Sequence, residues 1–249
     1  NNFDNASALT LANQPSWGNC GNPIFLGDNG VTIKANTEAP VGSTGTIDGT
    51  IYTVVDDATI AAQIAAGNYN LATTRVTNMV GDIDPVTAVG SNFFNDTNFN
   101  SDISFWDTSN VTNMSKMFFQ AVAFNQDIGN WDISSVIVMD NMFKFASAFN
   151  NGGINTIKNW NTSNVDNMGY MFAYAAAFNQ PLTRDGNKWD TSNVGFLDNM
   201  FNGAAAFNQD IGNWDTSSSF NMNGMFNDAA VFNQDLTDWC VTNITTKPT

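Results

Sequence analysis

Most of the side chains that could carry out chemistry in this chain are carboxylates. The 249 residues include 23 Asp or Glu, 8 Lys or Arg, 2 Cys and no His, so the formal net charge is −15. General acid–base catalysis without His needs a pair of carboxylates, and two lone cysteines without His cannot form a zinc site. The chemistry left to consider is a carboxylate pair, calcium held by Asp and Asn oxygens, or a disulfide.

The carboxylates recur in step with a repeated sequence, which argues against catalysis. A catalytic pair would be a departure from the repeat, and we find none; a nucleophile elbow and a glycine-rich phosphate loop are also absent from the sequence. The recurring acids are Asp107, Asp132, Asp190 and Asp215 after Trp, and Asp127, Asp210 and Asp235 after Phe-Asn-Gln. We therefore interpret these acids as turn formers and expect no enzyme activity, no catalytic residue and no cofactor. Calcium stays open as an alternative, although the glycine-rich calcium repeat is missing.

A unit of 25 or 29 residues recurs along the chain and positions these side chains. Each copy begins with Phe-Asn and reaches Trp seven residues later, or eleven residues later in the two longer copies. Extra residues confined to one place in a repeat are typical of loops on one side of a repeat structure. The Trp residues are Trp106, Trp131, Trp160, Trp189, Trp214 and Trp239, and the Phe residues that follow the first copy are Phe124, Phe149, Phe178, Phe207 and Phe232.

The apolar positions within one copy follow neither a period of 2 nor a sustained period of 3.6. They suit a short extended piece at Val-x-x-Met, about one helical turn at Met-Phe-x-x-Ala, and a Phe that closes the coil. A single copy cannot bury its own Trp, Met and Phe, so neighbouring copies must stack. The pattern predicts an α/β repeat solenoid that is leucine-rich-repeat-like, with short strands, short helical turns and an N-terminal capping helix.

Two polar positions also recur, and each has two interpretations. The Asn after Phe either forms a ladder that bonds the backbone of adjacent coils or is a surface turn residue. The Thr two residues after Trp, if exposed, forms a flat hydroxyl array suited to glycan; otherwise it is an ordinary polar residue on the outward face of a strand. The ladder residues are Asn100, Asn125, Asn150, Asn179, Asn208 and Asn233, and the Thr row is Thr108, Thr162, Thr191 and Thr216, interrupted by Ile133. Exposed aromatics outside the repeat, with Tyr52, Tyr69 and Phe25 as candidates, would favour glycan binding.

The N-terminal third differs from the repeats. Loose alternation over 46–55 predicts a strand or hairpin, and Asp57 is suited to cap a helix that ends before Gly67. A helix at this place would cover the open end of the core, as terminal repeats do. The expected organisation is 1–20 as the closing cap of a preceding module, 21–45 as a linker, 46–74 as an N-terminal cap with a helix at 58–66, 75–240 as a solenoid of about six coils, and 241–249 as the start of a C-terminal cap.

The runs Phe207-Asn-Gln-Asp-Ile-Gly-Asn-Trp214 and Trp106-Asp-Thr-Ser-Asn-Val-Thr-Asn-Met-Ser-Lys-Met-Phe118 resemble the ~25-residue repeat of bacterial surface proteins, the BspA-like or Mycoplasma-lipoprotein-associated type. The resemblance covers roughly residues 75–240. It implies a leucine-rich-repeat-like fold on secreted or cell-surface proteins that act in adhesion, surface architecture or partner binding. It implies no catalytic residues.

The two cysteines, Cys20 and Cys240, favour a disulfide, because their number is even. Within one module about six coils at ~4.8 Å each separate them by about 30 Å, beyond the ~7 Å limit between bridged Cα atoms. If another copy of the sequence followed residue 249, Trp239 and the next Trp17 would be 27 residues apart, within the repeat spacing. We therefore expect the disulfide between successive modules. Two unpaired thiols, or a bridge made by the linker folding back, remain the alternatives.

Charge and hydropathy restrict the classes of partner that the chain could bind. With so few Lys and Arg, nucleic acids and anionic membrane surfaces are excluded, and no apolar run reaches the ~18 residues of a spanning helix. We expect a structural and adhesive repeat module of a large fibrous protein at the cell surface or outside the cell. Its partners would be neighbouring copies of the module, with a homo-oligomeric bundle as a further assembly. The alternative is a ligand-binding adhesin domain for a glycan or a protein on another cell.

Overall fold

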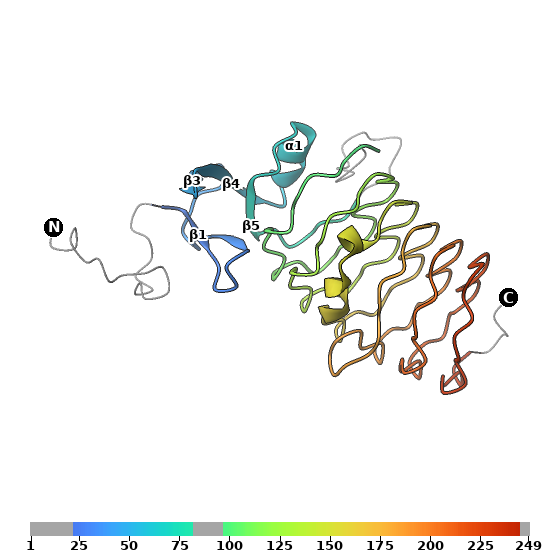
Figure 1. Ribbon diagram of the computed structural model, residues 1–249. Helices are drawn as coiled ribbons and strands as arrows, with labels where there is room; N and C mark the ends of the chain where they lie inside the picture. The colour runs from blue at the N-terminus through green and yellow to red at the C-terminus, as the bar shows by residue number, and fades with distance from the viewer. Residues whose placement is uncertain (1–21, 82–96, 245–249) are drawn as a thin grey trace, which may run out of the picture.

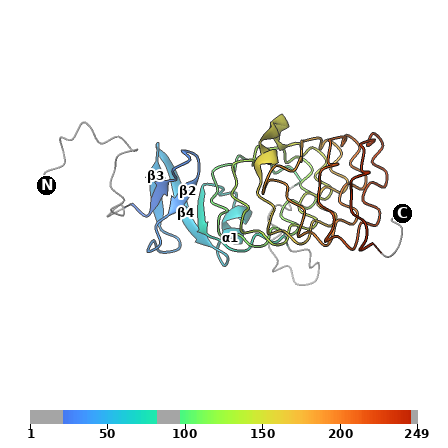
Figure 2. The same ribbon diagram turned by 90° about the horizontal axis from the view of Figure 1, so that it is seen from below.

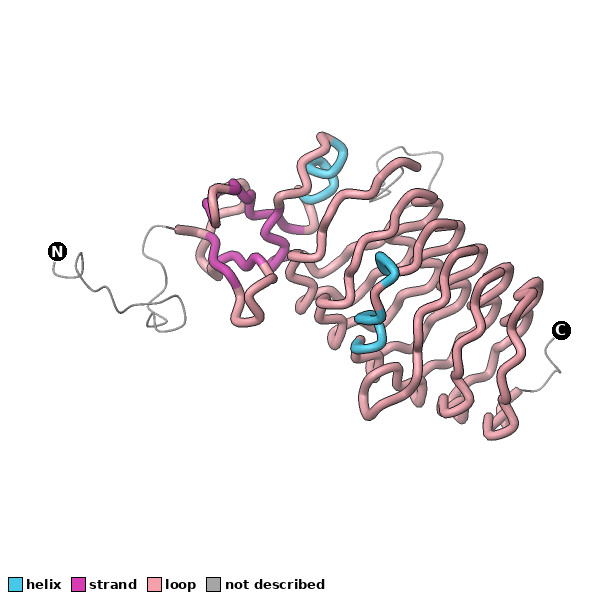
Figure 3. The backbone as a smooth tube through the Cα atoms, in the orientation of Figure 1, coloured by secondary structure: helices cyan, strands magenta, loops and turns pink. Residues whose placement is uncertain are grey.

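The computed structural model describes residues 22–81 and 97–244, and its regular elements gather near the N-terminus (Figure 1). The chain beyond residue 97 is almost entirely loop and turn (Figure 3). In chain order the elements are β1 (Ile24–Leu26), β2 (Ile33–Ala35), β3 (Thr44–Ile47), β4 (Thr50–Asp56), α1 (Ile60–Ala65), β5 (Leu71–Arg75) and two 3₁₀ helices, η2 (Asn151–Gly153) and η3 (Asn155–Asn159). Within the described ranges no helix has the length and hydropathy needed to span a membrane.

Two small sheets form the N-terminal part. β1 and β2 pair antiparallel, and β3 and β4 form a hairpin whose turn residues, Asp48 and Gly49, have φ values of 49° and 80°. Positive φ at both residues gives the twist that two-residue hairpins prefer. β5, which follows α1 in the sequence, then pairs with β4 in parallel. The stretch 21–45, expected to be a linker, therefore contains two strands, with Ile24 and Ile33 buried.

The one α-helix of the described residues, α1, lies inside the range 58–66 where the sequence predicts a helix. Its N-terminus carries no side-chain cap, so the expectation that Asp57 caps it is wrong. The Asp57 carboxylate instead accepts hydrogen bonds from the Thr77 and Asn78 backbone N–H groups and from the Thr77 hydroxyl. These bonds tie the start of α1 to the chain that follows β5. Ile60 of α1 is buried in the same apolar cluster as the repeats.

The copies of the repeat lie side by side as successive irregular loops (Figures 1 and 2). Isolated parallel β-bridges join the same position of neighbouring copies, at Asn78, Asn113, Val138, Asn167, Phe196 and Asn221. Alternate backbone N–H groups of one copy donate to carbonyls of the next copy, as Met114 donates to Val138 at 2.9 Å. Each copy thus satisfies much of its backbone through its neighbours rather than through strands of its own.

A chain of β-turns replaces the short helical turn expected at Met-Phe-x-x-Ala. The Ala121 N–H donates to the Phe118 carbonyl at 3.1 Å, an i to i+3 bond. Lys116, which precedes this turn, and Gln120, which lies within it, have φ values of 58° and 62°. A left-handed residue cannot continue a right-handed helix, and the same two positions are left-handed in the later copies as well. The helical turn expected from the spacing is therefore excluded by the backbone.

A single apolar cluster runs through all the described copies. The Phe that opens each copy stacks on its equivalents, with ring centroids 5.8 Å apart for Phe124 and Phe149 and 5.9 Å for Phe149 and Phe178. The Phe of Met-Phe forms a second column that packs against the first, at 3.9 Å between Phe143 and Phe149. The Trp rings stack in the later copies, 6.3 Å apart for Trp160 and Trp189. These distances between equivalent rings, 5.8–6.3 Å, fall in the range of offset stacking, so each ring stacks on its equivalent in the next copy.

Candidate functional site

Three side-chain rows link the copies. The first is a row of Trp indoles, which the sequence analysis placed in the core without assigning a polar partner. From Trp131 onward each Nε1–H donates to a carbonyl of the preceding copy, as Trp160 donates to Ile128 at 3.2 Å and Trp189 donates to Ile157 at 2.9 Å. Trp106 donates instead to the Tyr69 carbonyl, just before β5, at 3.0 Å. A buried indole N–H needs such an acceptor. The full row of donors is Trp106, Trp131, Trp160, Trp189, Trp214 and Trp239.

The second row is the Asn that follows Phe. The Oδ1 of Asn100 accepts the Asn125 N–H at 2.9 Å, and the Oδ1 of Asn125 accepts the Asn150 N–H at 2.8 Å. The same bond then joins Asn150 to Asn179, Asn179 to Asn208 and Asn208 to Asn233. These side chains are half-buried or exposed rather than buried. The row therefore links adjacent copies along the surface of the molecule.

The third row is the Thr two residues after Trp, and its hydroxyls point inward. Thr162 and Thr191 are fully buried, and their Oγ1 atoms donate to the carbonyls of Asp190 and Asp215 at 2.9 Å. Both expectations for this row, a flat exposed hydroxyl array and ordinary polarity on an outward face, are therefore wrong. Ile133 interrupts the row and is buried like its neighbours.

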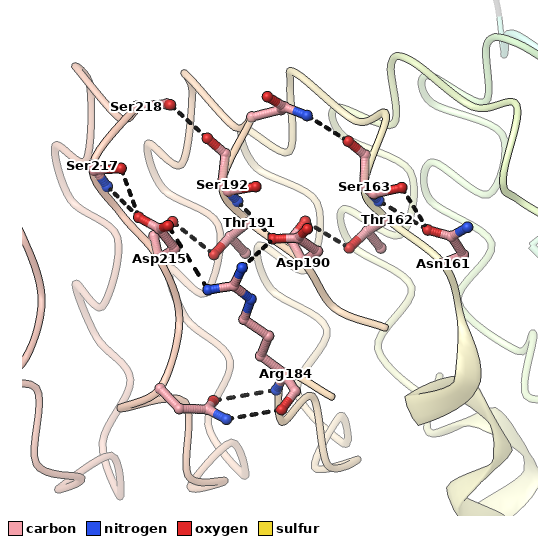
Figure 4. Close-up of polar contacts among 12 residues, drawn as sticks. Asn161, Thr162, Ser163, Arg184, Asp190, Thr191, Ser192, Asp215, Ser217 and Ser218 are labelled. Carbon is pink, nitrogen blue, oxygen red and sulfur yellow. Dashed lines mark hydrogen bonds and ion pairs between the residues drawn. The ribbon is translucent and has the colours of Figure 1, made fainter. Parts of the chain in front are cut away.

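The acids after Trp hold the turns that follow them (Figure 4). Asp215 Oδ1 accepts the Ser217 N–H at 3.0 Å and the Ser217 hydroxyl at 2.7 Å, and Asn161 serves Ser163 in the same way. The Ser217 bonds, and then the nearby Arg184, hold the pKa of the Asp215 carboxyl below its usual value. This is the turn chemistry that the sequence predicts for these acids.

Arg184 connects two of these turns and belongs to one of the longer copies. Its guanidinium lies 3.1 Å from the Asp190 carboxylate and 3.8 Å from the Asp215 carboxylate (Figure 4). Its backbone N–H and carbonyl bond the Asn213 side chain. Arg184 therefore ties the extra residues of its copy to the next copy. Both acids therefore take part in contacts that join neighbouring copies.

Within residues 22–81 and 97–244, no group of three or more His, Cys, Asp or Glu side chains could hold a metal ion, and no disulfide forms. Cys240 is exposed, and hydrogen bonding from Thr242 lowers the pKa of its thiol. Cys20 lies outside the described residues, so the disulfide between successive modules stays a prediction.

The aromatic side chains off the core positions pack on one another at the surface. The Phe145 and Tyr174 rings stack at 5.0 Å, and the Lys144 ammonium lies 4.1 Å from the centre of the Tyr170 ring. Tyr174 also covers Gly203, where a Cβ atom would approach its ring to 2.6 Å. These aromatic side chains therefore cover left-handed turns of the central copies.

A cleft of about 440 Å³ lies where the β1–β2 hairpin meets the first described copy. Ile33 of β2 forms a parallel bridge with Trp106, and its N–H donates to the Phe105 carbonyl at 2.8 Å. These contacts hold the hairpin against the first described copy. Phe25, Lys34 and Asp107 are among the lining residues. Sequence reasoning noted Phe25 but missed the cleft.

Comparison with known families identifies the repeat region. A family model described as "Mycoplasma protein of unknown function, DUF285" matches residues 67–184 and 184–248. The matched range begins just after α1, so strands β1 to β4 lie outside it. Comparison with curated proteins and with solved structures gives no match.

Proposed function

We propose that this chain, which belongs to the family described as Mycoplasma proteins of unknown function (DUF285), is a structural and adhesive repeat module of a large fibrous protein at the cell surface or outside the cell. The observation that carries the proposal is the identity of the contacts between copies. The same Trp, Asn and Thr positions bond in pair after pair. Such nearest-neighbour contacts are the basis of stability in repeat scaffolds.

The finer description that we propose is a leucine-rich-repeat-like solenoid of about six coils over 75–240. Its repeat resembles the BspA-like surface repeat, and its N-terminal cap is 46–74. Burial of Ile60 and Ile64 from α1 in the cluster of the repeats supports a capping role for this helix. Capping elements are required because an end coil otherwise exposes its apolar face.

The last two described copies support stacking against a further copy of the module. In the copy that begins at Phe207, the backbone N–H groups of Met222, Gly224, Phe226 and Asp228 have no hydrogen-bond partner within the described residues, whereas their equivalents in earlier copies donate to the next copy. Val241 is 53% exposed, while Ile133, at the same position in a covered copy, is 1% exposed. We propose that residues 1–20 of an adjoining module cover this face, with Cys20 joined to Cys240.

Electron microscopy of the native full-length protein tests this function. Rods or filaments with a regular period of one module are the expected result, because each copy presents the contacts that the next one needs. Isolated compact particles without such a period would contradict the scaffold role.

A second candidate function is a ligand-binding adhesin domain. The cleft between the β1–β2 hairpin and the first described copy favours it, because its volume falls in the range of small-molecule sites. The two functions are compatible, since a scaffold can display such a site on its surface.

A further inference from the structure

Asp107 departs from the pattern of its equivalents in the other copies. Its side chain is 2% exposed, compared with 13% for Asp190 and 35% for Asp215. Its Oδ1 accepts the Ser109 hydroxyl at 2.7 Å, the turn bond made throughout the row. Asp107 is therefore the one acid of this row, among those described, that combines the turn with near-complete burial.

The second oxygen of Asp107 has no hydrogen-bond partner within the described residues. Its nearest cation is the Lys34 ammonium at 3.7 Å, longer than a hydrogen bond. A buried oxygen left unbonded costs about 1–3 kcal/mol, and more when it is charged. Because Asp107 lines the cleft of about 440 Å³, a donor group on a ligand is suited to occupy this position.

Other free polar groups line the same cleft. The side chains of Asp28 and Asn130 are exposed and make no hydrogen bond within the described residues. Asp132 bonds Ser134 through Oδ1, which leaves its Oδ2 free. The half-buried Phe25 ring adds an apolar wall. The cleft thus offers several acceptors, the amides of Asn29 and Asn130, and the Phe25 ring beside the buried Trp106, a combination that fixes the orientation of a small polar ligand.

The charges in the cleft restrict the class of ligand. Three carboxylates, from Asp28, Asp107 and Asp132, face a single ammonium, from Lys34, so phosphate and carboxylate ligands are repelled. A cationic ligand would compete with the Lys34 ammonium already beside Asp107, and the described residues form no metal-binding group of acids. A neutral ligand with many hydroxyl donors satisfies these conditions.

We propose that this cleft binds a neutral saccharide unit, with a sugar hydroxyl donating to Asp107 Oδ2 and the C–H face of the sugar packed against the Phe25 ring. Asn130 and Asp132 lie along the lining and take further hydroxyls. The proposal rests on the adhesive part of the proposed function and names its ligand class. It places the binding site at the junction of the hairpin with the repeats.

The test measures binding of the full chain to immobilised neutral oligosaccharides that end in hexose or N-acetylhexosamine. Calorimetry then gives the affinity for each glycan that binds. Asp107→Asn is the key variant, because Asn161 occupies the equivalent position and keeps the same bonds to its Ser. Phe25→Ala removes the aromatic wall. Asp215→Asn is the matched control, since it makes the same exchange in a copy whose turn lies outside the cleft.

The proposal expects binding of one or more neutral glycans by the unmodified chain, with affinity lowered at least about tenfold, or 1.4 kcal/mol, in Asp107→Asn and in Phe25→Ala. Asp215→Asn should bind as the unmodified chain does. Binding of no neutral glycan, binding of sialylated glycans alone, or equal affinity in all four proteins would overturn it. Circular dichroism of each variant checks that the fold persists. Filaments without glycan binding would refute this inference alone, and glycan binding without rods would refute the scaffold alone.

Discussion

The N-terminal part and the repeat region reach stability by different routes. In residues 22–81, β1 to β5 satisfy the backbone through sheet pairing, and two apolar clusters meet there. In residues 97–244, side chains satisfy part of the backbone, because Asn Oδ1, Thr Oγ1 and Trp Nε1 each form a hydrogen bond with the backbone of a neighbouring copy. A chain poor in strands can therefore satisfy much of its backbone through side chains when each turn is repeated at a fixed spacing.

The largest effect is expected from the aromatic column. Trp160→Ala removes a ring that is 1% exposed and a hydrogen bond to Ile128, so we expect a loss of about 3–5 kcal/mol in the free energy of unfolding. Val54→Ala in the N-terminal sheet, also buried, should cost about 1.5–3 kcal/mol. Urea unfolding of both variants measures the comparison, and equal losses would remove the distinction between the regions.

The next effect comes from two glycines with the same left-handed backbone, Gly203 and Gly30, at φ 68° and 70°. A Cβ at Gly203 would lie 2.6 Å from the Tyr174 ring, whereas a Cβ at Gly30 meets nothing within 4 Å. Gly203→Ala should therefore cost about 1–3 kcal/mol more than Gly30→Ala. Thermal and urea unfolding give the two values. A larger loss in the hairpin glycine would show that the surface aromatics do not constrain the turns.

The buried hydroxyl row should give a smaller effect. Thr191→Val keeps the shape of the side chain but leaves the Asp215 carbonyl without its donor, which should cost about 1–3 kcal/mol. Thr46→Val in β3 changes an exposed side chain and should stay within about 0.5 kcal/mol of the unmodified protein. If both changes proved neutral in urea unfolding, the Thr row would not link the copies.

The smallest effect concerns pH. The folded pKa of Asp215 lies below its value of 3.8 in the unfolded chain, so its contribution is present above that pH and is lost as pH falls through the folded pKa. The unmodified protein should therefore lose more stability than Asp215→Asn between about pH 5 and pH 3. Unfolding curves at several pH values provide the comparison, and identical pH slopes would exclude the contribution of Ser217 and Arg184.

Sequence reasoning succeeded where a side chain recurs at a fixed spacing. The positions of Trp160 and Phe149 in the buried cluster follow from repetition. The helix α1 lies within the expected range, although the Asp57 cap expected at its start does not form. The Asn row was expected on the same ground, although its members lie nearer the surface than a buried ladder would.

The features that sequence reasoning missed depend on contacts between distant segments. A Lys in the sequence does not indicate a left-handed backbone, so the positive φ of Lys116 could not be foreseen and a helical turn was expected directly after it. The inward direction of Thr191 depends on where the next copy places its carbonyl. The burial of Asp107 depends on β2 docking beside Trp106, and β2 lies in a stretch whose Gly and Pro content is typical of a linker.

Exchange of the indole N–H protons, followed by nuclear magnetic resonance in deuterated water, tests the stacking of the copies most directly. The buried donors belong to Trp131, Trp160, Trp189 and Trp214, and each bonds a carbonyl of the copy before it. We predict that these four indole protons exchange far more slowly than that of Trp239, which lies on the uncovered face of the last copy and is half-buried. Loss of all the indole signals at one fast rate would contradict a continuous dry column of rings.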